Sequence, residues 1–158
     1  GTTIKMLKQQ LESSGVRVHA GAPYKLVLLS EENSQRTLSY TGGGNSAEYE
    51  IGTTLKYEIL THDNLHLLDD KLEVQKVFLH DGNNITGSDQ ESSETRKEMR
   101  RDLIQRMLIR LQLLTPEQLA QLQATAEAKA KAEADALEAA RKAEAETPRQ
   151  SPMELPNQ

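Results

Sequence analysis

The sequence has no cysteine and no tryptophan, and aromatic residues make up only 3% of its 158 residues. Without cysteine, the chain has no disulfide, no thiol nucleophile and no thiolate metal ligand of its own. So few aromatic side chains argue against a stacking platform for single-stranded nucleic acid. No apolar run reaches the length of about 18 residues that a membrane-spanning helix needs, so we expect no such helix in this sequence.

The charges are also not distributed as a nucleic-acid-binding surface requires. The formal net charge is -5, and acidic and basic residues nearly balance up to Thr115. A protein that binds nucleic acid needs a clustered basic field, so we expect no nucleic-acid partner. Large aliphatic residues concentrate before Leu114, whereas Ala, Glu, Lys and Gln dominate beyond Pro116. We therefore expect one folded domain within residues 1–115.

The first segment has the spacing of an amphipathic helix. Ile4, Leu7 and Leu11 lie three and four residues apart, and Gly15 follows at the place of a left-handed C-cap. Residues 16–18 then alternate apolar and basic side chains, which is typical of a short strand. The sequence thus predicts a helix that ends near Gly15, followed by extended chain.

Alternating patterns predict an antiparallel meander in the middle of the chain. The clearest strand spans residues 47–59, whose odd positions are mostly apolar and whose even positions are mostly polar. Two earlier extended pieces, 24–29 and 36–40, are separated by a polar stretch. A later strand spans 65–80, with a polar interruption at Asp69–Asp70. Short turns join these stretches, so neighbouring strands should pair antiparallel.

Two helix starts follow the strands. Ser88 and Glu91 have the spacing of a capping box, and the next helix carries Met99, Leu103 and Met107 on one side. We expect that side to pack against the buried face of the sheet. The opposite side is rich in arginine. It is expected to be a solvated face, although an acidic or phosphate-bearing partner is a second reading.

Beyond the domain, the sequence predicts a long polar helix and a tail. Thr115 and Pro116 form a second start signal, and residues 116–146 are rich in good helix formers. The apolar content of this helix is too low for a core face. Residues 147–158 contain three prolines and are expected to be disordered. The predicted units are therefore residues 1–115, 116–146 and 147–158.

No set of residues has the pattern of an active site or a metal site. His62 and His66 are four apart, but they flank a turn and no third ligand is evident, so no metal or cofactor is expected. Glu48 with Glu50, and Asp69–Asp70, read as solvated charges without a nucleophile beside a base. The sequence therefore favours a binding protein over an enzyme.

Four short segments, in this order, resemble the LptE family. They are 11–16 (LESSGV), 46–50 (SAEYE), 74–78 (VQKVF) and 97–103 (KEMRRDL). The resemblance covers roughly residues 1–114, and the order of helix, meander, long helix and polar tail also agrees with the family.

The resemblance implies an α+β fold, a two-layer sandwich in which two helices cover one face of a mainly antiparallel four-stranded sheet. The family's first strand precedes the first helix, and a lipidated cysteine anchors the family to the outer membrane. Neither lies within this sequence, which begins at Gly1. We interpret the sequence as a mature or truncated piece of such a protein.

The resemblance also implies a function. Family members are non-catalytic, bind as a plug inside the β-barrel protein LptD, help it to assemble, and contact lipopolysaccharide during delivery to the cell surface. They act at the cell outer membrane, on its periplasmic side and in the barrel lumen. The alternative function is a periplasmic or cytosolic chaperone-like adaptor that binds a client through the C-terminal helix. A stronger apolar stripe in residues 116–146 would have favoured that alternative.

The candidate site residues follow from this reading. Barrel contacts are expected on the polar strand face and the turn before it, at Tyr40, Thr41, Gly42, Asn45, Glu48, Glu50 and Glu58. In relatives, basic residues that contact lipopolysaccharide occur at the positions of Gly42 and Ser88, so those contacts do not carry over. Arg36, Lys56 and Lys76 are the expected substitutes, because cationic side chains bind phosphate groups.

Overall fold

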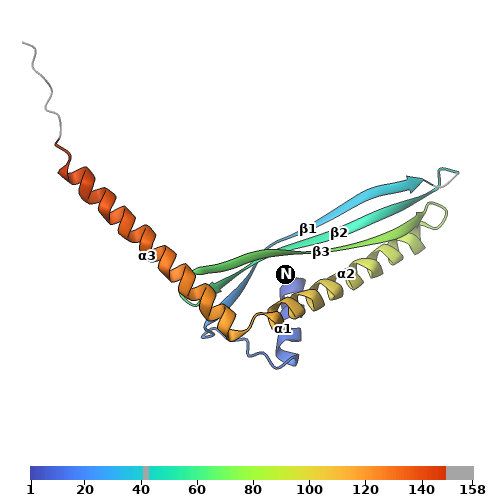
Figure 1. Cartoon of the computed structure of the whole chain (residues 1–158). Coiled ribbons are helices and arrows are strands. Elements are labelled where there is room, and N and C mark those ends of the chain that lie inside the picture. The colour runs from blue at the N-terminus through green and yellow to red at the C-terminus, as the bar shows by residue number, and fades with distance from the viewer. Residues whose placement is uncertain (41–42, 149–158) are drawn as a thin grey trace, which may run out of the picture.

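The protein, represented by a computed structural model that describes residues 1–40 and 43–148, consists of a three-stranded sheet and three helices. Helices α1 and α2 lie on the same side of the sheet, and α3 extends away from one end of it (Figure 1). This arrangement confirms the predicted α+β fold with two helices on one face. In chain order the elements are α1 (Thr2–Ser13), β1 (Tyr24–Tyr40), β2 (Ser46–Thr61), β3 (His66–Asp81), α2 (Ile85–Leu113) and α3 (Pro116–Glu146).

The central strand β2 has the alternation that its sequence predicts. It pairs antiparallel with β1 on one side and with β3 on the other, so the strand order is β1-β2-β3. Ile51, Leu55 and Ile59 are buried beneath the helices, whereas Glu48 and Lys56 are exposed on the opposite face. The period of two therefore separates a core face from a polar face along the whole strand.

The outer strands are longer than their sequences predict. β1 runs without a break through the polar stretch, with Asn33 opposite Thr53 and irregularities near Leu29 and Leu38. β3 likewise continues through Asp69–Asp70. The prediction of two separate extended pieces, 24–29 and 36–40, was wrong. Backbone pairing with β2 holds the polar residues between them in the sheet. Residues 16–18, predicted as a strand, have no strand pairing in the structure.

The core lies between β2, β3 and the apolar side of α2. Met99, Leu103 and Met107 are each no more than 1% exposed, and they pack in one cluster with Leu55 and Val74. The predicted packing side of this helix is thereby confirmed.

The start of α2 differs from the predicted capping box. Asn84 is the N-cap, and its side-chain oxygen accepts a hydrogen bond from the backbone N–H of Gly87. Ser88 instead lies inside the helix and is buried, and its hydroxyl accepts a hydrogen bond from the backbone N–H of Asp81. The prediction from Ser88 was wrong because this hydroxyl joins the helix to the end of β3.

Both predicted terminal signals of the other helices are present. Gly15 has φ +86°, and the backbone N–H of Val16 bonds to the carbonyl of Leu11, so the chain leaves α1 through a left-handed cap. Thr115 and Gln118 form a reciprocal capping box at the start of α3. The first turns of α3 contact the core through Leu119, Leu122 and Ala126, and every described residue beyond Ala126 is exposed.

An ion pair between Arg110 on α2 and Asp70 on β3 joins the helix to the sheet beside the core. Arg110 binds the carboxylate of Asp70, which also accepts a hydrogen bond from the backbone N–H of Lys71 at 2.8 Å. The Lys71 N–H lowers the pKa of Asp70 below its usual value, and Arg110 and the Tyr57 hydroxyl add to this effect. Burial raises the pKa of Tyr57. The charged form of Asp70 is thus favoured in the folded state.

The Asp70→Asn variant is expected to be less stable than the wild type at neutral pH, by an amount that disappears in acid. Because the folded-state pKa of Asp70 is depressed, its contribution is fully present above the unfolded value of about 3.9 and is lost as pH falls through the folded value. Denaturation midpoints of both proteins between pH 2 and pH 7 measure this. A stability difference that stays constant down to pH 2 would contradict the assigned role of the carboxylate.

Candidate functional site

The sheet face opposite the helices, here called the outer face, carries five of the eight candidate residues that the structure describes. Its strands present both signs of charge, and carboxylates outnumber cations among them. The acidic, lysine and arginine residues of this face are Lys25, Glu32 and Arg36 on β1, Glu48, Glu50, Lys56 and Glu58 on β2, and Asp69, Lys71, Glu73 and Asp81 on β3. Such a face is largely polar and suits a hydrated or polar partner.

Ion pairs organise the outer face. Arg36 Nη2 lies 2.9 Å from Glu50 Oε1, and Lys56 Nζ lies 2.9 Å from Glu32 Oε1. The hydrogen bond and positive charge of Lys56 lower the pKa of Glu32 below its usual value. Since these pairs are largely exposed, they contribute little to stability. A phosphate that bound Arg36 or Lys56 would have to exchange places with a carboxylate.

The third candidate lipid ligand, Lys76, lies on the other side of the sheet. Lys76 is paired with Ile51, a core residue, so its side chain is directed toward the helices. There its Nζ lies 2.9 Å from Glu98 on α2, and this contact lowers the pKa of Glu98. The structure therefore groups Arg36 with Lys56 on the outer face and separates both from Lys76.

The candidate barrel contacts are grouped along β2 and at its start. Glu48, Glu50 and Glu58 all lie on the outer face, and the Ser39 hydroxyl donates to Glu48 at 3.1 Å. Tyr40, at the end of β1, is 74% exposed. Asn45 is exposed in the same turn and its carbonyl accepts a hydrogen bond from Gly82. Thr41 and Gly42 lie outside the described residues.

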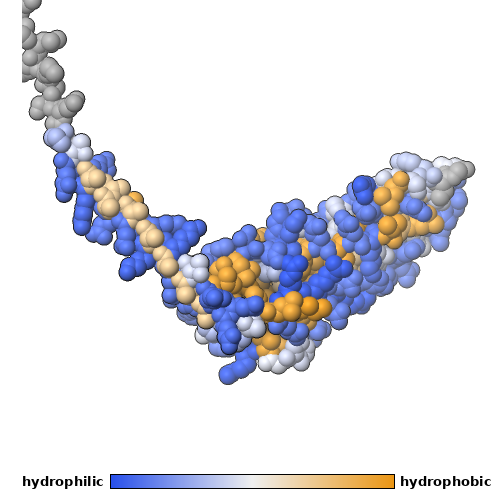
Figure 2. Space-filling view, viewed as in Figure 1, coloured by the Kyte–Doolittle hydropathy of each residue, from blue (hydrophilic) through white to orange (hydrophobic). Residues whose placement is uncertain are grey.

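Two apolar residues on the outer face were not predicted from the sequence. Val77 is 56% exposed opposite Glu50, and Leu79 is 46% exposed opposite Glu48. Apolar side chains also gather at this distal end of the sheet in the space-filling view (Figure 2). The signal was that residues 77–79 are apolar at consecutive positions, which places apolar side chains on both faces of a strand. The charged outer face thus has an apolar part near the C-terminal end of β3, shortly before α2 begins.

Two classes of site are not found among the described residues. Within residues 1–40 and 43–148, no group of three or more carboxylate or histidine side chains is placed to hold a metal ion. Within the same ranges, no helix combines the length and apolarity needed to cross a bilayer.

The meander, the two helices on one face and the polar outer face define a small α+β domain. The profile of the LptE family, described as lipopolysaccharide-assembly, matches residues 5–111. The chain belongs to the LptE family, and its role is in lipopolysaccharide assembly at the outer membrane. No curated protein matches the sequence.

Two solved structures have a similar fold. Rare lipoprotein B from Shewanella oneidensis is 22% identical, with a TM-score of 0.62 over 70% of this chain and 85% of that one. A minor lipoprotein from Acinetobacter baumannii is 18% identical, with a TM-score of 0.56 over 66% of this chain and 77% of that one. At these identities the likeness concerns the fold.

Proposed function

We propose that this protein is a non-catalytic assembly factor that binds within the lumen of an LptD β-barrel, helps the barrel to assemble and assists lipopolysaccharide delivery to the outer leaflet. It would act on the periplasmic side of the outer membrane, held there by a lipid anchor outside this sequence. The observation that carries the proposal is the polar outer face, with its paired charges, on a domain of the LptE family. Barrel interiors are polar, so such a face suits a lumen.

The outer face and the 41–46 turn, with Tyr40 just before it, are the proposed barrel contacts. Glu48, Glu50 and Glu58 project from one face of β2, so a single barrel wall could contact all three. Val77 and Leu79 would add apolar contact area beside the carboxylates. Thr41 and Gly42 remain part of the proposed contact on sequence grounds. Residues 1–115 form the binding domain in this proposal, and residues 116–158 are dispensable for capture.

Lipopolysaccharide is the proposed second ligand. Arg36 and Lys56 lie on one face and are separated by several rungs of the sheet, whereas Lys76 lies on the other face. In the structure each of these cations is paired with a carboxylate. Phosphate groups would therefore bind by replacing Glu50 at Arg36, Glu32 at Lys56 or Glu98 at Lys76. Charge-assisted contacts of this type are the strong ones that phosphate recognition uses.

Co-purification tests the barrel proposal. The full chain and a version ending at Thr115 would be co-expressed with an LptD barrel and purified in detergent through a tag on the barrel. Both versions are expected to stay bound in equal amount. Capture of the long version alone would instead favour the adaptor function, in which α3 is the binding element. Capture of neither would refute the barrel proposal if the family's first strand, when added back, also failed to restore it.

Reversing two carboxylates of the outer face is expected to weaken barrel capture at least tenfold. The double variant Glu48→Lys, Glu50→Lys changes both side chains that lie beside Val77 and Leu79. These residues are not in the core, so the denaturation midpoint should change little. The matched control is Glu133→Lys, Asp135→Lys on the exposed part of α3. Equal capture of both double variants would contradict the outer face as the interface.

A further inference from the structure

A large apolar cavity lies at the end of the domain where α1, the start of β1 and the end of α2 meet. Its volume is about 760 Å³, within the range of roughly 300–1,000 Å³ that small-molecule sites have. Aliphatic side chains supply most of the wall, and the 14–22 segment closes one side. The main apolar lining residues are Leu7, Leu11, Leu26, Leu28, Leu111 and Leu119.

The charged residues around the cavity are cationic, beside the neutral polar residues Ser14, Tyr24 and Gln112. Lys8, Arg17 and Lys25 line it together with His19, whereas none of the described residues that line it is Asp or Glu. This absence stands out in a chain of net charge -5, with 24 acidic residues. Positive charge without negative charge at the rim of an apolar cavity is complementary to an amphiphile with an anionic head group.

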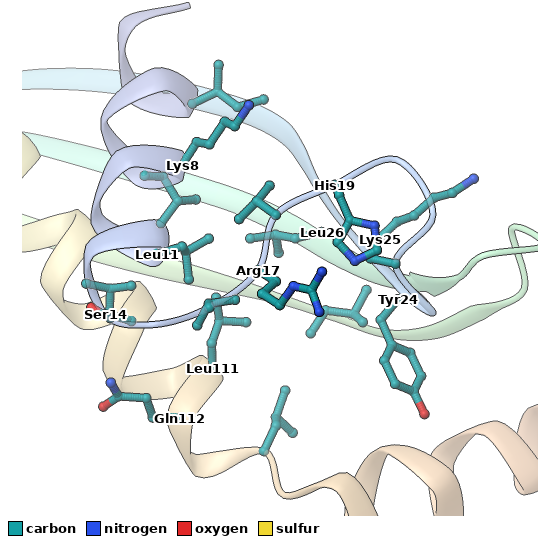
Figure 3. Close-up of a pocket in the computed structure, with 18 of the residues that line it drawn as sticks. Lys8, Leu11, Ser14, Arg17, His19, Tyr24, Lys25, Leu26, Leu111 and Gln112 are labelled. Atoms are coloured by element: carbon teal, nitrogen blue, oxygen red, sulfur yellow. The ribbon is translucent and has the colours of Figure 1, made fainter.

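Arg17 is the best placed of these cations. In the close-up its side chain lies in the space between Leu26 and Leu111, whereas the ring of His19 lies beside Lys25 (Figure 3). Lys25 points away from this space, and its Nζ donates to Asn64 at 2.9 Å. A guanidinium carries a permanent charge and can bind a carboxylate or phosphate through two parallel hydrogen bonds. Arg17 could therefore hold a head group above the apolar interior.

We propose that this cavity binds one acyl chain of an anionic lipid, with the head group at Arg17 and the chain among the leucines. The inference goes beyond the proposed function, whose lipid contacts are polar ones on the strands. An apolar peptide segment is the competing occupant. Such a peptide would be stabilised by contact with the leucines, but the cationic rim without carboxylates would add nothing to its binding. The charge around the cavity thus favours the lipid.

Binding of single-chain amphiphiles to the full chain tests the proposal. The probes are decanoate, dodecanoate and dodecyltrimethylammonium, each below its micelle concentration, followed by methyl NMR of the wild type. Dodecanoate is expected to shift the methyl resonances of Leu26 and Leu111 in a saturable way. It should bind about tenfold more tightly than decanoate, because each buried methylene adds to binding. The cationic amphiphile should bind at least tenfold more weakly than dodecanoate.

Two variants separate the head-group contact from the apolar contact. Arg17→Glu, at an exposed position, should remove the preference for the anionic probe. Ala22→Trp should fill part of the cavity and abolish binding, with Ala139→Trp on exposed α3 as its control. Equal binding of both head groups to the wild type, or shifts that do not centre on the cavity, would overturn the proposal. That result would not change the outcome of the barrel-capture experiment, so the proposed function and the lipid site are tested independently.

Discussion

The Leu103→Ala variant is expected to lose about 2–5 kcal/mol of unfolding free energy, the cost of a large-to-small change in a close-packed core. Leu103 is 0% exposed, and it belongs to the cluster formed by α2 with β2 and β3. Two other fully buried side chains of that cluster, Met99 and Met107, lie one turn away on either side. A cavity left at Leu103 therefore has little room to collapse. Urea denaturation followed by circular dichroism measures the change.

The matched control for this variant is Leu113→Ala on the same helix. Leu113 is 69% exposed at the last residue of α2, so its removal should change the midpoint by less than about 0.5 kcal/mol. Equal losses at Leu103 and Leu113 would contradict the assigned core face of α2. An unchanged midpoint for Leu103→Ala would contradict the packing of α2 on the sheet altogether.

The Ala130→Pro variant is expected to remove much of the helical signal of α3 without destabilising the domain. Proline inside a helix costs about 3 kcal/mol relative to alanine, and isolated helices are only marginally stable in water. Every described residue beyond Ala126 is exposed, so no tertiary contact offsets this loss. The helicity of the distal part should fall, while the cooperative unfolding transition of the domain keeps its midpoint.

A proline placed in α2 provides the contrast. Ile104→Pro interrupts a helix that is buried against the sheet, and it should abolish cooperative unfolding. If Ala130→Pro lowered the domain midpoint as well, the distal part of α3 would have to contact the domain in solution. That outcome would contradict the assignment of the distal part of α3 as a solvated helix and would favour a role for it in binding.

Regular alternation allowed the centre of the fold to be predicted. β2 lies between two strands and has one face under the helices, so each residue is constrained and its pattern is clear. The distal half of β1 is exposed on both faces, so burial imposes no pattern on residues 31–40. Its strand structure depends on backbone pairing with β2, which composition does not reveal. The start of α2 was missed because Ser88 bonds to Asp81, a contact outside its own helix.

The candidate site was predictable to different degrees. Glu48, Glu50 and Glu58 share a face by parity alone, and the structure keeps them together. The side of Lys76 could also have been read from parity, because Val74 and Phe78 lie two residues away and are buried. The apolar cavity could not be predicted. Its walls come from α1, the 14–22 segment, β1, β2, α2 and α3, and only tertiary packing brings these segments together.

Site-specific photocrosslinking tests the central claim that the outer face contacts the barrel. A photoreactive residue at Glu58 on the outer face, or at Gln105 on the exposed side of α2, would be introduced into the chain co-expressed with LptD. Strong crosslinks to the barrel are expected from the Glu58 position and much weaker ones from the Gln105 position. Strong crosslinks from Gln105 with none from Glu58 would contradict this claim, and would place the interface on the helical side of the domain.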